Sequence, residues 1–121
     1  MIEYMKHITR DYVRKNLHKT FLFGDNLQQR GMGGQAKEMR CEPNCVGIPT
    51  KKKPSMSDNS FFNDNEFSDN CWAIDNALAR AVMLGNEIYV IPSAGLGTGL
   101  AKLPEKAPKT YQYLMDRLEE L

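Results

Sequence analysis

At 121 residues, the chain is long enough for one domain with a core that needs no metal or disulfide staple. Charged residues make up 26% and nearly balance to a net charge of +1, which argues against a general nucleic-acid binder, because such proteins usually carry a basic excess. No apolar run approaches the roughly 18 residues of a membrane span, and residues 1–4 do not resemble a secretory signal.

These features predict a cytoplasmic protein without a membrane partner. Cys41, Cys45 and Cys71 form no paired framework and lack the spacing of a zinc knuckle. We therefore expect free cytosolic thiols, no metal site and no cofactor.

Taken in chain order, the predicted elements alternate between strand and helix. The predicted strands are residues 2–5, at a sheet edge, then 20–23, 45–48 and 87–91. The predicted helices run from a Thr9 cap to about Leu17, over residues 35–40, from a Ser68 or Asp69 cap to about Leu84, and from near Pro108 onward. Such alternation implies one α/β domain over residues 1–121, a three-layer α/β/α sandwich with a mostly parallel sheet.

Helical spacing also predicts which side chains are buried. Gly85 is the expected end of the third helix, and Trp72 and Tyr89 are expected in the core. The expected apolar stripes are Val13 and Leu17; Cys71, Ile74, Leu78 and Ala81; and Tyr111, Leu114, Met115, Leu118 and Leu121.

A polar segment, residues 51–67, shows neither helical nor strand periodicity. A segment of this length in a small domain is usually a functional or a disordered loop. Phe61 and Phe62 within it could stack on a base or anchor the loop to the core, and we favour the anchor.

Two glycine-rich loops each follow a predicted strand. The first glycine loop, residues 30–35, follows the turn expected at Gly24, Asp25 and Asn26, and the second, residues 93–99, follows strand 87–91. Glycine lets the backbone approach a ligand closely, and ligands in open α/β sheets bind beyond the carboxyl ends of the strands. Two such loops side by side could supply the convergent N–H donors that a diphosphate needs.

Two familiar phosphate-binding motifs do not account for the first glycine loop. The P-loop pattern G-x-x-x-x-G-K-[ST] is absent. Residues 31–36 match G-x-G-x-x-A, but the first glycine lies well past the strand end, and strand 45–48 ends in Pro49 and Thr50 without an acid for a ribose. A Rossmann fold is therefore disfavoured.

Three stretches together resemble a small macro domain, the fold that binds ADP-ribose. The similarity is strongest to the branch with the terminal ADP-ribose protein glycohydrolase and ADP-ribose-1″-phosphate phosphatases. Residues 30–36 resemble the R-M-G-x-G-x-A loop of that branch with one residue inserted, residues 48–52 resemble its I-T-K-K strand end, and Pro92 with residues 96–103 resembles its phosphate loop.

The resemblance implies a nucleotide-binding cleft and a candidate reaction. Ligand contacts are expected from Asp25, Asn26, Arg30, Gly31, Met32, Gly33, Gly34, Gln35, Ser93, Gly95, Leu96, Gly97, Thr98 and Gly99. In the glycohydrolase a lysine at the strand end is the nucleophile and an aspartate in the phosphate loop assists it. Lys51 occupies the lysine position, whereas Ala101 occupies the aspartate position, so Asp25 is the remaining candidate assistant.

The expected function is binding of ADP-ribose or a related nucleotide, with an ADP-ribosylated macromolecule as a possible partner. One alternative is a hydrolase that removes ADP-ribose or dephosphorylates ADP-ribose-1″-phosphate, with Lys51 and Asp25 as catalytic residues. Another is a protein-interaction module with a vestigial cleft.

Overall fold

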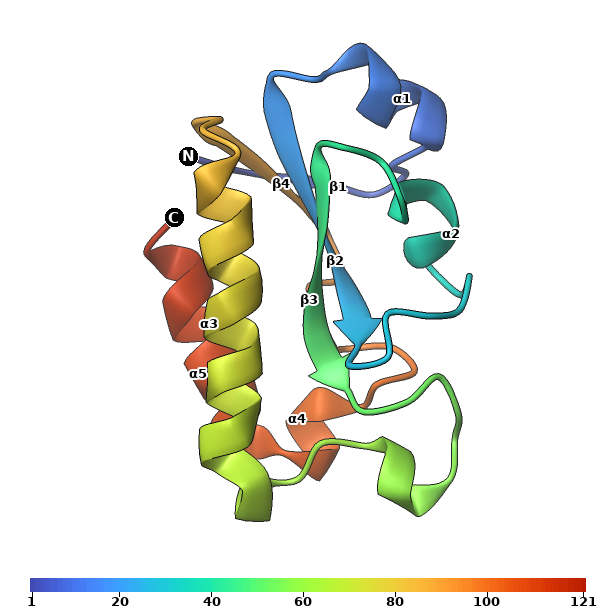
Figure 1. Cartoon of the computed structure of the whole chain (residues 1–121), viewed down its shortest axis with the longest axis vertical. Helices are drawn as coiled ribbons and strands as arrows, with labels where there is room; N and C mark the ends of the chain where they lie inside the picture. Colours follow the sequence, from blue (N-terminus) through green and yellow to red (C-terminus); the bar gives the residue numbers. More distant parts are fainter.

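Four parallel strands form the centre of the molecule, in the order β1-β4-β2-β3 (Figure 1). The structure is a computed structural model that describes residues 1–121. The strands are β1 (Ile2–Met5), β2 (Lys19–Asn26), β3 (Cys45–Lys51) and β4 (Ile88–Pro92). The prediction of an α/β fold with a parallel sheet and residues 2–5 at its edge is confirmed.

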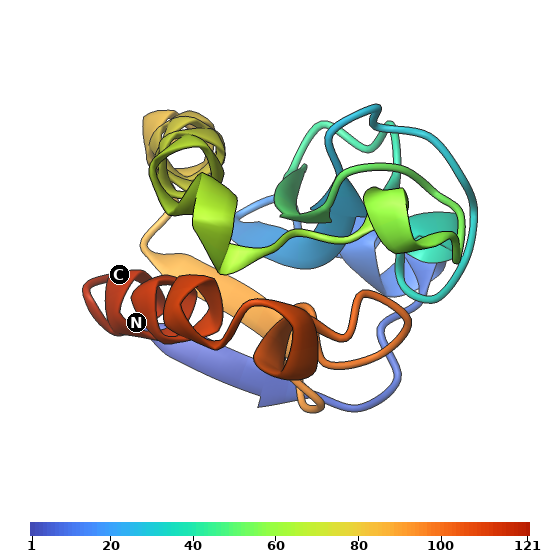
Figure 2. The same cartoon turned by 90° about the horizontal axis from the view of Figure 1, so that it is seen from below.

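Helices cover both faces of this sheet. Figure 2 shows α3 (Phe67–Met83) and α5 (Pro108–Glu119) on one side, and α1 (Arg10–Lys15) and α2 (Ala36–Met39) on the other. A further short helix, α4 (Leu103–Lys106), precedes α5 and was not predicted. The arrangement is compatible with the predicted α/β/α sandwich.

The central strands bury side chains on both faces, which explains their nearly continuous apolar sequences. In β2, Leu22 packs into the cluster under α3 and α5, whereas Phe21 and Phe23 pack into the cluster under α1 and α2. In β4, Tyr89 joins the first cluster and Val90 the second. This alternation follows from the two-residue period of a strand, and the expected burial of Tyr89 is confirmed.

Both strands that lead into the candidate site are longer than predicted. The turn expected at residues 24–26 is wrong, because Asp25 and Asn26 continue β2 and pair with Pro49 and Lys51 of β3. Strand β3 likewise continues through Pro49 to Lys51 instead of ending at residue 48. Pro49 is tolerated there because β3 is an edge strand and does not need every N–H for pairing.

The observed ends of α1 and α3 differ from the predicted ends in several details. Thr9 caps α1 as predicted, since its hydroxyl accepts a hydrogen bond from the Tyr12 N–H. However, α1 ends at Lys15, so Leu17 lies past the helix and is 60% exposed, against expectation. The predicted caps of α3, Ser68 and Asp69, lie inside its first turn because the helix begins at Phe67.

The burial pattern of α3 otherwise follows its sequence, with one exception. Ile74, Leu78 and Ala81 are buried and Cys71 is half-buried. Gly85 follows the helix end with φ +78°, as expected for its role. Trp72 is 72% exposed on the outer face, so its expected core position is wrong.

The C-terminal stripe and the polar segment bear out their predictions. Leu114 and Leu118 of α5 are buried, with Tyr111, Met115 and Leu121 packed against the same cluster. Residues 52–66, between β3 and α3, form an irregular loop with two 3₁₀ turns. Phe62 anchors this loop in the core cluster, as favoured, and Phe61 is also buried.

The three cysteines are free, and none of the helices has the length and hydropathy of a membrane span.

Candidate functional site

A cavity of about 600 Å³ opens at the carboxyl ends of β2, β3 and β4. Its volume falls in the range of small-ligand sites. The two glycine loops face each other across it because β2 and β4 are adjacent and parallel. The predicted site residues that line it are Asp25, Asn26, Arg30, Gly31, Met32, Gly33, Gly34, Gln35, Lys51, Gly95, Gly97, Thr98 and Gly99.

Two predicted site residues do not line the cavity, and several others were missed. The Leu96 side chain is 1% exposed within the core cluster, and Ser93 does not line the cavity although its neighbours Pro92 and Ala94 do. The lining residues not predicted include Arg40, Thr50, residues 54–56, Leu100 and Ala101. The sequence did not indicate Arg40 as a site residue, because it follows α2 and lies outside the first glycine loop.

The glycine loops present many backbone N–H groups without partners. None of the N–H groups of residues 31–35 donates a hydrogen bond within the protein, and the same holds for residues 96–101. Both segments lie outside helices and strands, so no regular ladder uses these donors. Convergent unpaired N–H groups of this kind make an anion-binding concavity.

Gly97 is the glycine that the second loop most clearly requires. Its φ is +77°, and a Cβ atom there would lie 3.0 Å from Leu103 side-chain atoms and 3.1 Å from the Thr50 methyl group. A side chain at this position would be strained and would collide with its neighbours. By contrast, Gly33 in the first loop has no positive φ and no atom within 4 Å of a built Cβ.

Arg40 neutralises the only carboxylate in the cavity wall. Its two terminal nitrogens donate to the Asp25 carboxylate at 2.7 and 3.1 Å, and both side chains are largely buried. The Asp25 carboxylate lies against Gly47, where a built Cβ would be 2.5 Å from Oδ2. Asp25 is therefore held across the backbone of β3 by a bidentate ion pair.

Asn26 and Arg40 together hold the start of the first glycine loop. Asn26 Nδ2 donates to the Arg30 carbonyl at 2.7 Å, and Asn26 Oδ1 accepts from the Gln28 N–H. Arg40 Nε donates to the Gly31 carbonyl at 2.9 Å. The side chains expected to touch a ligand, Asp25 and Asn26, thus fix the loop that faces it.

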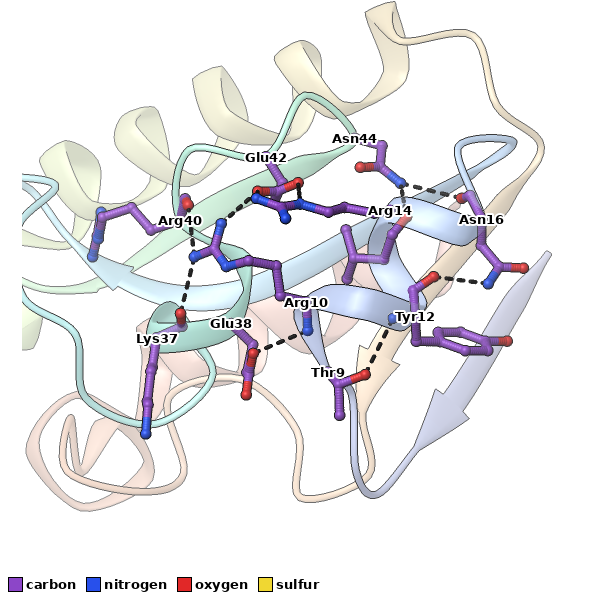
Figure 3. Close-up of polar contacts among 11 residues, drawn as sticks. Thr9, Arg10, Tyr12, Arg14, Asn16, Lys37, Glu38, Arg40, Glu42 and Asn44 are labelled. Atoms are coloured by element: carbon purple, nitrogen blue, oxygen red, sulfur yellow. Dashed lines mark hydrogen bonds and ion pairs between the residues drawn. The ribbon is translucent and has the colours of Figure 1, made fainter.

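A second polar network fixes α2 behind this loop (Figure 3). The Arg10 guanidinium donates to the carbonyls of Lys37 and Arg40 and pairs with Glu42, which Arg14 also contacts. The two arginines hold the pKa of Glu42 below its usual range against the opposing effect of burial. This network sets the position of Arg40 and, through it, of the first glycine loop.

Lys51 ends β3, and its largely buried side chain contributes an ammonium group to the cavity. It is 8% exposed, and its only hydrogen-bond partner is the Met56 sulfur at 3.4 Å. Its Nζ also lies 4.9 Å from the centre of the Phe61 ring. Burial, with a smaller contribution from the positive charge of Lys102, lowers the pKa of Lys51.

The cavity is therefore cationic and poor in acid–base groups. Arg30, Arg40 and Lys51 face a single carboxylate, Asp25, and no histidine, cysteine or tyrosine lines the wall. Because Arg40 already pairs with Asp25, the charges of Arg30 and Lys51 have no carboxylate partner. Such a wall suits an anionic ligand.

The fold and the cavity define an α/β protein with a small-molecule-sized pocket at the carboxyl edge of a parallel sheet. The chain belongs to a family of unknown function, DUF7831, whose model matches residues 3–117. No curated protein and no solved structure gave a significant match.

Proposed function

We propose that this protein binds ADP-ribose or a closely related nucleotide in the cavity between its two glycine loops, as a macro-domain-like module. The observation that carries the proposal is the set of unpaired N–H groups at residues 31–35 and 97–101, two segments that line one cavity and follow two adjacent strands. A diphosphate accepts several hydrogen bonds at once and matches this donor set. Arg30 adds a guanidinium without a carboxylate partner.

Calorimetric titration with ADP-ribose, ATP and NAD tests this proposal. We expect saturable binding of ADP-ribose at one site per chain and weaker binding of at least one of the other two nucleotides. Absence of binding by all three would reject the proposal and favour a protein-interaction module.

A second candidate, an ADP-ribosyl hydrolase or ADP-ribose-1″-phosphate phosphatase, is favoured by one observation. Burial lowers the pKa of Lys51, and a lysine that is more readily neutral is a better nucleophile. Against it, Asp25 is bound to Arg40, and Ala101 lines the cavity where the assisting carboxylate was sought. The cavity then offers no unengaged carboxylate for proton transfer.

We therefore expect binding without turnover. The direct comparison is wild type against Lys51→Ala on an ADP-ribosylated protein and on ADP-ribose-1″-phosphate, with ADP-ribose affinity measured in parallel. Turnover in the wild type that disappears in Lys51→Ala, with affinity retained, would establish the hydrolase instead, because it would show loss of a step and not of a contact.

A further inference from the structure

A second cavity, of about 500 Å³, shares a wall with the candidate site. Asp25 and Arg40 line both cavities, so their ion pair is common to the two. The second cavity is also lined by Cys41 and Cys45, whereas Cys71 lines neither of them. All three thiols are free. Two thiol groups therefore gather at a cavity that the proposed nucleotide site does not use.

The chain around these two cysteines is folded into two consecutive tight turns. The first turn, residues 39–42, is closed by a hydrogen bond from the Glu42 N–H to the Met39 carbonyl at 3.1 Å. The second, residues 42–45, is closed by the Cys45 N–H and the Glu42 carbonyl at 3.2 Å. Each such turn brings its end Cα atoms within about 7 Å of each other. A disulfide needs Cα atoms about 4 to 7 Å apart, and both cysteines lie within this compact segment.

Cys41 occupies a backbone position that usually carries glycine. Arg40 and Cys41 are the central residues of the first turn, with φ −58° and ψ 135° at Arg40 and φ +72° at Cys41. These angles define a type II turn, whose third residue is usually glycine or asparagine because its φ is positive. Residues held in such uncommon conformations are frequent at functional sites.

The two thiols differ in accessibility and therefore in their roles during oxidation. Cys41 is exposed, whereas Cys45 is half-buried. Burial raises the pKa of Cys45 to about 12, the Glu42 carboxylate adds to this effect, and the Arg10 guanidinium opposes it. The Cys45 thiol thus stays protonated at neutral pH, and an oxidant in solution meets Cys41 first.

Arg40 connects the first turn to the first glycine loop. Its backbone directly precedes Cys41, and its guanidinium donates to the Asp25 carboxylate and to the Gly31 carbonyl. A change in the turn angles therefore alters the position of the side chain that holds the loop.

We propose that Cys41 and Cys45 form a reversible disulfide in the presence of a peroxide, and that this bond changes the conformation of the first glycine loop through Arg40. The Cys41 thiolate attacks one peroxide oxygen and becomes a sulfenic acid, while the other oxygen leaves as hydroxide and takes up a proton to give water. The Cys45 sulfur then displaces the hydroxyl group of the sulfenic acid, which leaves with the Cys45 proton as a second water. The two thiols lose two electrons in total, and these reduce the peroxide. An added dithiol returns both cysteines to the thiol form by exchange.

The first test is treatment of the wild type with hydrogen peroxide, followed by alkylation of the remaining thiols and peptide mass mapping. We expect the peptide with Cys41 and Cys45 to lose two hydrogens and to escape alkylation, while Cys71 is alkylated. Cys71→Ser, the matched control for a cysteine outside this cavity, should give the same disulfide. Cys45→Ser should accumulate oxidised Cys41 without a disulfide. A wild type in which Cys45 is still fully alkylated after treatment would overturn the proposal.

The second test compares amide NMR spectra of the reduced and the oxidised wild type without any ligand. We expect the signals of residues 30–35 to shift on oxidation and to return with dithiothreitol, and Cys45→Ser treated in the same way should lack these shifts. Loop signals that stay fixed in a protein shown to hold the disulfide would overturn the link through Arg40. Because no ligand is present, either failure leaves the proposed function untouched.

Discussion

At the scale of single residues, the environment of Lys51 makes a prediction about stability. The ammonium group of this largely buried side chain meets a sulfur atom and an aromatic face but no carboxylate. Lys51→Met keeps the packing and removes the desolvated charge, so we expect the free energy of unfolding at pH 7 to increase by about 1 kcal/mol. Chemical denaturation measures it, with Lys53→Met as the control expected to change stability little. A loss of stability in Lys51→Met would show that favourable interactions in the folded protein outweigh the desolvation of the Lys51 charge.

The same pair of proteins should differ in their pH dependence. The pKa of Lys51 is lowered in the folded state from 10.5, so the unfolded chain binds the proton more tightly. The cost of the charge is therefore complete below the lowered pKa and is relieved as pH rises from that value to 10.5. The stability advantage of Lys51→Met should shrink over this interval, and an advantage that grows with pH would contradict the assignment.

The two glycine loops differ in what a side chain would do. Gly33→Val adds atoms to open space in the cavity, and we expect at least a tenfold loss of ADP-ribose affinity with an unchanged melting temperature. Gly97→Val forces a side chain against Leu103 at a positive φ and should lower the melting temperature as well. Ala79→Val, on the exposed side of α3, is the control for added volume outside the site.

At the scale of elements, the Asp25–Arg40 pair connects β2, α2 and the first glycine loop. Arg40→Ala leaves a buried carboxylate without its cation and should destabilise the fold by about 3 kcal/mol. Denaturant unfolding measures the loss, and amide exchange of residues 27–30, whose N–H groups are hydrogen-bonded, should accelerate because Arg40 also holds the Gly31 carbonyl.

A double-mutant cycle distinguishes this pairing from simple loss of packing. Asp25→Asn combined with Arg40→Ala removes the unpaired charge and should recover part of the stability lost in Arg40→Ala alone. Additive losses in the double variant would show that the two side chains do not depend on each other.

The strands and the long helices could be predicted from the sequence because the patterns that indicate them are local. The apolar run at residues 20–23 and the stripe of α5 are each visible in a short window. The ends of β2 and β3 were missed because Asp25, Asn26 and Pro49 favour turns locally, whereas pairing between the two strands overrides that preference. Trp72 and Leu17 were misplaced for a similar reason, since only the positions of the helix ends and faces decide their exposure.

The candidate site likewise combines features that the local sequence predicts with features that only tertiary packing decides. Glycine spacing was sufficient to place both loops at one sheet edge, and the structure brings them to one cavity. The partners of Asp25 and Lys51 could not be read from the sequence, because Arg40, Met56 and Phe61 reach them through tertiary packing. This packing leaves Asp25 neutralised and Lys51 unpaired, which favours binding over catalysis.

At the scale of the whole molecule, N–H donors and cations surround a single cavity at the carboxyl ends of three strands, β2, β3 and β4. The outer face of α3 exposes Trp72 and Met83, neither of which lines the cavity, and it therefore offers an internal reference. A ligand that uses the proposed donors must therefore perturb the glycine loops and leave this helix face unchanged.

The most direct test of nucleotide binding is an amide NMR titration of the wild-type protein with ADP-ribose. We expect saturable shifts in the N–H signals of residues 31–35 and 96–101, with Trp72 and Met83 unaffected. Loop signals that stay fixed at saturating ADP-ribose, or shifts confined to α3, would contradict the account.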